Sequence, residues 1–187
     1  GKLLMHRIYQ LILAVAGFSF LSLATVAEDV EIYLINKLDG NLNHYCLDML
    51  GFQDNANPEG NLQTHTCYSY QGQLAVDQKM PVEEVAMGKI NLYSFDRCAR
   101  INGTNGGSTI GLAECSDDDE MQKIMLTENG QLIPEAAPTM CFTSGTSSWR
   151  GGRDGNSPHQ IRTLNLQPCS DEALVYQRWG TRTGVTE

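Results

Sequence analysis

Alternating apolar and polar residues identify the first structural element of the chain. In residues 28–39 (EDVEIYLINKLD), Val30, Ile32 and Leu34 alternate with other residues, which predicts a first strand. Gly40 and Asn41 follow it directly, and both residue types favour turns. We therefore expect a strand that ends in a turn at these two residues.

The rest of the chain shows no long helical period. Short β-rich segments alternate with turns rich in Gly, Asn, Asp and Ser; these segments are residues 60–68, 89–95, 108–115, 122–130, 131–135 and 161–169. Asn129-Gly130 is a strong hairpin signal, and residues 81–88 (PVEEVAMG) predict a short helical turn. Many short strands with frequent turns indicate an all-β barrel or sandwich.

An internal repeat narrows the choice among all-β folds. Each copy holds a first cysteine, a second cysteine and then a Gln-x-hydrophobe. The copies are Cys46…Cys67…Gln78-Lys79-Met80, Cys98…Cys115…Gln122-Lys123-Ile124 and Cys141…Cys169…Gln177-Arg178-Trp179. Three copies spaced by roughly 43 to 55 residues match the threefold symmetry of a β-trefoil.

The first copy carries the candidate chemistry, within the stretch Cys46–Met80. Five of its side chains stand at offsets measured from the cysteines or close to the Gln-x-hydrophobe: Asp48, Gln63, His65, Asp77 and Gln78. If Cys46 and Cys67 pair, they bring the two ends of the stretch together around one shallow pocket. Carboxylates and amides for hydroxyl groups, beside a flat ring, are typical of a sugar-binding site. We expect Asp48 to lie at the surface of that pocket.

The same stretch resembles one repeat of a ricin-B-type lectin, which is a β-trefoil. The resemblance rests on Cys-Leu-Asp, on Leu-Gln-x-aromatic-x-Cys and on Asp-Gln-x-hydrophobe, and it covers about residues 42–180. It implies that Asp48, Asp77 and Gln78 bind sugar hydroxyls, that His65 stacks on the sugar ring, and that Gln63 is an auxiliary contact. Two positions depart from the family pattern, since His65 replaces the usual Trp or Tyr and Met80 replaces the Trp of Gln-x-Trp.

The resemblance and the order of the repeats also suggest how the cysteines pair. Six cysteines allow 15 pairings, and the repeats favour three local ones: Cys46–Cys67, Cys98–Cys115 and Cys141–Cys169. The second and third copies lack parts of the site, with Arg100 and Thr143 in place of the Asp. Ala113 and Gln167 stand where the ring is expected. Only the first copy is therefore a complete site, and the implied ligand is a galactose-like sugar bound by one repeat.

Simpler interpretations of these residues remain open. Asp48 could cap a turn, and a lone His65 could be a half-buried residue without function. Gln78 could bind backbone in the hairpin, because its counterparts persist in the incomplete repeats. The segment 149–153 (WRGGR), within the Cys141–Cys169 insertion, is either a mobile surface loop or a contact for a partner.

Residues 1–27 differ from the rest because they contain no Asp or Glu. Lys2, His6 and Arg7 form a basic region, and the uncharged run 8–27 ends in small residues. A secretory signal peptide is the leading interpretation. A membrane anchor is the alternative, because about 20 uncharged residues can span a bilayer. Either interpretation places residues 28–187, the predicted lectin domain, outside the cytoplasm.

Charge limits the partners of that domain. It holds all 22 acidic residues and 11 of the 13 basic ones, so its formal charge is −11. Such a surface disfavours nucleic acid and anionic membranes. All six cysteines also lie in this domain, and an even number outside the cytoplasm indicates disulfides.

No pattern in the sequence indicates catalysis, a metal or a cofactor. The acidic run 116–120 lacks the spacing of an EF-hand loop, the histidines lack zinc spacing, and no G-x-S-x-G motif occurs. We therefore expect a non-catalytic, exported protein that binds a glycan or glycoconjugate. The alternative is a β-trefoil tethered by residues 8–27 to partner proteins in a membrane complex, with a vestigial sugar site.

Overall fold

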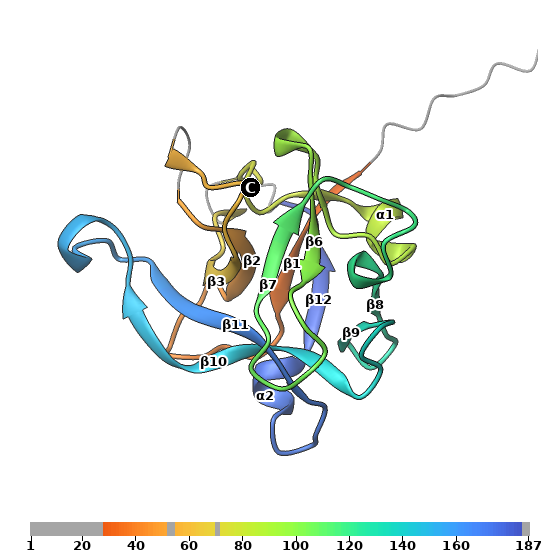
Figure 1. Cartoon of the computed structure of the whole chain (residues 1–187). Coiled ribbons are helices and arrows are strands. Elements are labelled where there is room, and N and C mark those ends of the chain that lie inside the picture. The colour runs from red at the N-terminus through yellow and green to blue at the C-terminus, as the bar shows by residue number, and fades with distance from the viewer. Residues whose placement is uncertain (1–27, 52–54, 70–71, 185–187) are drawn as a thin grey trace, which may run out of the picture.

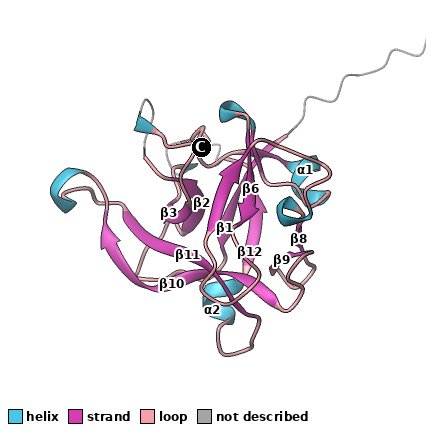
Figure 2. Ribbon diagram, viewed as in Figure 1, coloured by secondary structure: helices cyan, strands magenta, loops and turns pink. Residues whose placement is uncertain are grey.

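The structure is a computed structural model that describes residues 28–51, 55–69 and 72–184. Strands dominate these residues, with a few short helices at the periphery (Figure 2). The strands of the first repeat are β1 Asp29–Leu34, β2 Tyr45–Met49, β3 Leu62–Thr66 and β4 Met80–Pro81. Those of the second are β5 Asn91–Leu92, β6 Arg97–Ile101, β7 Ile110–Ala113 and β8 Ile124–Leu126. Those of the third are β9 Leu132–Pro134, β10 Met140–Arg150, β11 Gln160–Pro168 and β12 Trp179–Arg182.

Each repeat thus contributes four strands, which is the arrangement of a β-trefoil. The second and third strands of each repeat form a hairpin, and β1 pairs with both β4 and β12, so that the first and last strands of the described chain meet. Between the strands that the structure describes lie short helices, α1 Val82–Ala86 and α2 Leu174–Gln177, and 3₁₀ turns at Tyr93–Phe95, Glu120–Gln122 and Arg153–Gly155. The all-β prediction and its threefold repeat are confirmed.

The apolar alternation of the first strand places its side chains in the core. Val30, Ile32 and Leu34 are all buried, but the strand ends at Leu34 and not at residue 39. The chain turns at Asp39 and Gly40, which both have positive φ angles (56° and 66°). Trp179 closes the core at 1% exposure, and its Nε1 donates to the carbonyl of Phe142 at 3.0 Å.

The hairpin predicted at Asn129-Gly130 connects β8 and β9. Thr127 N donates to the carbonyl of Gln131 across the turn at 2.9 Å. Gly130 has a φ of 82°, a conformation that glycine adopts without strain. The helical turn expected in residues 81–88 corresponds to α1.

Three disulfides form within the repeats, as the repeat order predicts. They are Cys46–Cys67, Cys98–Cys115 and Cys141–Cys169. Each bridge joins the second strand of a repeat to the residue at or just after the end of its third strand. Three such bridges are typical of proteins in oxidising compartments outside the cytoplasm.

The glutamines of the three Gln-x-hydrophobe motifs make equivalent hydrogen bonds beside these bridges. The side-chain oxygens of Gln78, Gln122 and Gln177 accept from the backbone N–H that follows the second cysteine, at 3.0, 3.0 and 3.2 Å. Their amide nitrogens donate to the carbonyl that precedes the same cysteine, at 3.3, 2.8 and 3.0 Å. The glutamine therefore fastens each hairpin to the strand that follows it.

The third repeat breaks the symmetry through its long hairpin. β10 and β11 extend away from the barrel (Figure 1), and β11 also pairs with β3 of the first repeat. The resulting sheet has the order β10-β11-β3-β2-β1-β12. Arg162 of β11 reinforces the junction, since its Nε and Nη2 donate to both carboxylate oxygens of Asp39 at 2.9 and 2.8 Å.

The predicted signal peptide or anchor, residues 1–27, lies outside the described residues. Among the residues that the structure describes, no helix is both long and apolar enough to cross a bilayer.

Candidate functional site

Strand pairing assembles the candidate site on one face of the sheet formed by β2, β3, β11 and β10. His65 lies opposite Cys46 on one side and Ile161 on the other, and Ile161 lies opposite Trp149. The neighbouring row of the same face is Asp48, Gln63 and Thr163. Because side chains two residues apart in a strand point to the same face, both rows share one surface.

Asp48 is buried in this arrangement. Its exposure is 1%, and its two oxygens accept from the amide nitrogens of Gln63 and Gln78, both at 2.8 Å. The expectation that Asp48 lies at the surface is therefore wrong, because the two glutamine side chains occupy both of its oxygens. Burial, and then the nearby Asp77 carboxylate, raise the pKa of Asp48 well above its usual value, although both amide donors lower it.

Asp77 and Gln78 lie next to Asp48, as their spacing from the cysteines in the sequence predicts. The carbonyl of Asp77 accepts from the backbone N–H of Met49 at 3.2 Å, which fixes the approach of this segment to β2. Asp77 is 2% exposed, and its Oδ2 has no hydrogen-bond partner among the described residues. Burial raises the pKa of Asp77 as well. Two carboxyl groups therefore lie close together at a buried position.

His65 belongs to a cluster of three rings. Its Nδ1 bonds the carbonyl of Thr66 at 2.8 Å, and its ring stacks on Tyr68 at a centroid distance of 5.0 Å. His159 contacts both rings edge-on, at 5.3 Å from His65 and 5.0 Å from Tyr68. Burial lowers the pKa of His65 to about 4. The imidazole is consequently neutral at physiological pH, and its residue is 7% exposed, at the wall of the cavity described next.

A cavity of 710 Å³ opens over this face. Its lining residues are Leu50, Gly51, Asn55, Gln63, His65, Tyr68, Trp149, Gly152, Ser157, His159 and Ile161. Two of the five predicted residues, Gln63 and His65, line it. Asp48, Asp77 and Gln78 do not, and Asp48 is connected to the cavity through the amide of Gln63.

Several lining residues are not indicated by the repeat pattern. Tyr68 directly follows Cys67, at a position that the resemblance does not assign to the site. Trp149 and His159 belong to the insertion between Cys141 and Cys169. The sequence analysis singled out the segment 149–153, which contains Trp149, as a possible partner contact, and it did not single out His159. Trp149 forms part of the cavity wall at the end of β10.

The equivalent positions of the other two repeats are occupied by structural contacts. Arg100, at the position of Asp48, pairs with Asp119 at 2.8 Å. Thr143 accepts from the amide of Gln177 at 3.0 Å. Asp119 also accepts from the backbone N–H of Met121 at 3.0 Å. The Asp119 carboxylate, which belongs to the acidic run 116–120, thus caps a 3₁₀ turn and forms an ion pair with Arg100.

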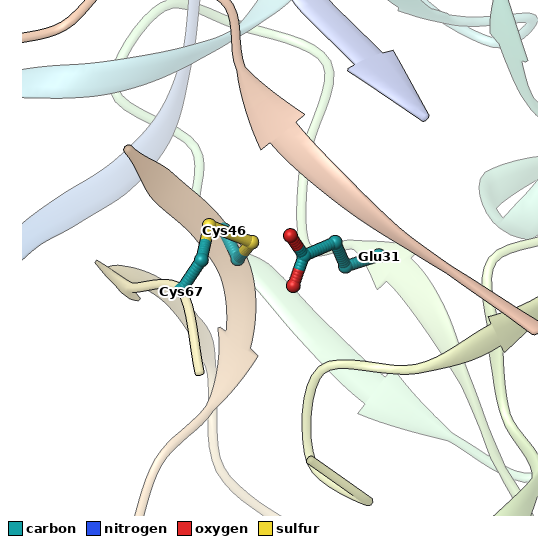
Figure 3. A group of neighbouring side chains, drawn as sticks. All are labelled: Glu31, Cys46 and Cys67. Carbon is teal, nitrogen blue, oxygen red and sulfur yellow. A yellow bond between two sulfur atoms is a disulfide. The ribbon is translucent and has the colours of Figure 1, made fainter. Parts of the chain in front are cut away.

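One cluster of metal-binding residue types occurs among the described residues, and Figure 3 shows it. The Glu31 carboxylate faces Cys46 and Cys67, but their sulfur atoms form a disulfide and are not thiolate ligands. Glu31 Oε1 instead accepts from Ser69 Oγ and Arg182 Nε, both at 2.5 Å. The cluster therefore lacks the ligand set of a metal site.

Comparison with solved structures shows the fold. The chain is similar to the mdaA-1 domain (TM-score 0.59, 17% identity, 87% of this chain and 93% of that one). It is also similar to the β-trefoil lectin of the Vibrio vulnificus hemolysin/cytolysin, solved with N-acetyl-D-lactosamine bound (TM-score 0.55, 17% identity, 87% and 99%). An agglutinin from Abrus precatorius matches with a TM-score of 0.51 and 16% identity, over 84% of this chain and 48% of that one.

No protein-family model matches the sequence, and no curated protein matches it significantly. The structural matches establish a β-trefoil fold that lectins share, and the ricin-B resemblance remains an inference from the sequence motifs.

Proposed function

We propose that the protein is a non-catalytic lectin that binds a galactose-like sugar in the cavity of the first repeat. The observation that carries this proposal is the combination of an uncharged stack of rings, His65 and Tyr68, with the fixed amide of Gln63 in one open cavity. Apolar surface with a few oriented polar groups is typical of ligand sites. A sugar offers matching groups, since its ring has C–H faces and its edge carries hydroxyls.

Each predicted residue has a role in this proposal. His65 stacks on the sugar, and the amide of Gln63 binds a hydroxyl. Asp48 holds that amide in place, and Gln78 fixes Asp48 from the other side. Asp77 does not line the cavity, and its backbone carbonyl, which accepts from the backbone N–H of Met49, holds its segment against β2. The sugar-bound lectin of Vibrio vulnificus supports the proposal, because the two chains share the fold.

The test is an NMR titration of the isotope-labelled protein with galactose. A single shallow site should give a dissociation constant of about 1 mM. His65→Ala and Gln63→Ala should each weaken binding about tenfold or more, because each removes a direct contact worth about 1.5 kcal/mol.

The other repeats offer matched controls. Gln167 and Asn165 occupy the positions of His65 and Gln63 in the third repeat, so Gln167→Ala and Asn165→Ala should leave the affinity unchanged. Equal losses in all four variants would place the site elsewhere. If neither galactose nor glucose, mannose or their N-acetyl forms shift any resonance, the lectin proposal is wrong.

A further inference from the structure

The cavity has a second wall, which comes from a different repeat. Gln63, His65 and Tyr68 belong to the first repeat, whereas Trp149, Gly152, Ser157, His159 and Ile161 belong to the β10–β11 hairpin of the third. A site built on one repeat of a trefoil needs only the first set. The second set enlarges the cavity beyond the position of the ring cluster.

Trp149 is the largest side chain of this second wall. It lies in the same cross-strand row as His65, with Ile161 between them. Two strand spacings separate the backbones of β3 and β10, about 10 Å in total, which is longer than one pyranose ring. The row therefore offers two aromatic surfaces, one at each end, with an aliphatic side chain between them.

Core packing does not account for Trp149. Trp149 is 48% exposed, whereas Trp179 in the core is 1% exposed. An exposed large aromatic side chain that lines a cavity is typical of a binding surface. The cavity volume of 710 Å³ lies in the upper part of the range of about 300–1,000 Å³ for drug-sized ligands. A single hexose is smaller than such ligands.

The second wall is also held in place before any ligand arrives. β11 pairs with β3, and Thr66 Oγ1 accepts from the backbone N–H of Gln160 at 2.9 Å. The hairpin loop is closed by Gly151 N, which donates to the carbonyl of His159 at 2.9 Å, and by Ser157 N, which donates to that of Gly151 at 3.0 Å. A preorganised wall binds without the entropic cost of ordering a loop.

We propose that Trp149 and the β10–β11 hairpin form a second subsite that binds the next residue of a sugar chain. The ligand is accordingly an oligosaccharide or a glycan chain of at least two residues, with one sugar ring on His65 and the adjacent ring on Trp149. This inference rests on the proposed lectin function and specifies its ligand class.

The experiment compares monosaccharides with disaccharides on the full chain. Calorimetric or NMR titrations would use galactose and lactose, N-acetylglucosamine and chitobiose, and mannose and mannobiose. For the pair that binds, the disaccharide should bind about tenfold more tightly than the monosaccharide. Trp149→Ala should abolish that gain and leave monosaccharide affinity unchanged, and Trp149→Phe should keep part of it.

Met87→Ala is the control, because Met87 is 71% exposed and does not line the cavity. It should change neither affinity. Circular dichroism should show that all variants fold, since Trp149 lies at the surface. If a disaccharide gains nothing, or if Trp149→Ala weakens both ligands equally, the second subsite is refuted while the lectin function stands. If no member of any pair binds, both proposals are wrong.

Discussion

Replacing Asp48 by Ala tests the buried network that joins the site to the fold. The change removes both acceptor oxygens of a residue that is 1% exposed. The amide nitrogen of Gln63 then loses its acceptor, and that of Gln78 keeps only its longer bond to the Thr66 carbonyl at 3.3 Å. We therefore expect a loss of stability as well as a loss of binding.

The expected loss of stability is the balance between the hydrogen bonds that Asp48 accepts and the cost of burying its charge. Each hydrogen bond to a charged acceptor contributes about 1.5–3 kcal/mol. Burial and the nearby Asp77 carboxylate destabilise the charged form of Asp48 and so offset part of this gain. We expect the free energy of unfolding to fall by about 2–4 kcal/mol. Asp48→Asn, which keeps one acceptor oxygen, should lie between the wild type and Asp48→Ala.

Urea denaturation followed by circular dichroism measures this effect. Thr143→Val is the matched control, because Thr143 holds the equivalent position in the third repeat, where its hydroxyl accepts from Gln177 at 3.0 Å and donates to the carbonyl of Cys141 at 2.9 Å. These two neutral bonds should each be worth about 1 kcal/mol. A loss of less than about 0.5 kcal/mol in Asp48→Ala is the size expected of a surface substitution, and it would refute the buried network.

Three further predictions concern protons and disulfides. The pKa of His65 is about 4 in the folded protein and near 6.5 in the unfolded chain, so stability should fall by on the order of 3 kcal/mol from pH 6.5 to pH 4. In His65→Phe, denaturation curves should show that most of this dependence of stability on pH is lost. The part that remains comes from His44 and His159, whose pKa values are also lowered. Because burial raises the pKa of Asp77, ionisation of this carboxyl group destabilises the fold as pH rises. Asp77→Asn should therefore increase the urea midpoint at pH 7 more than at pH 3. An equal change at both pH values would contradict this prediction. The bridge of the second repeat contains the exposed Cys115 and should be reduced first, whereas both cysteines of the first bridge are fully buried and should react last in differential alkylation.

The repeat pattern predicted those parts of the structure that depend on local spacing. The disulfides and the glutamine contacts follow from it because each lies within one repeat and involves residues near a cysteine. The alternation of Val30, Ile32 and Leu34 likewise predicted a strand with a buried face. Such features depend on periodicity and turns, which the sequence displays directly.

The second wall of the cavity was not predicted, because it depends on pairing between two repeats. Nothing in the order of residues states that β11 lies beside β3, so the contact of His159 with His65 and the place of Trp149 in the cavity wall could not be inferred. The burial of Asp48 was not predicted either, although it arises within the first repeat, because it requires the side chains of Gln63 and Gln78 to converge on one carboxylate. The predicted β-rich segment 161–169 corresponds to β11, but the sequence analysis predicted neither β10 nor the pairing of β11 with β3.

Because β11 pairs with β3, the complete cavity exists only when the first and third repeats have folded against each other. Thr66 and Gln160, which bond across that junction, are 94 residues apart in the sequence. Contacts between such distant segments are costly in loop-closure entropy, and they form only when the intervening chain has folded. A fragment that holds the first repeat alone would contain His65 and Gln63 without the second wall of the cavity. Affinity for a sugar chain would therefore report that the first and third repeats have come together, and an occupied cavity would oppose their separation.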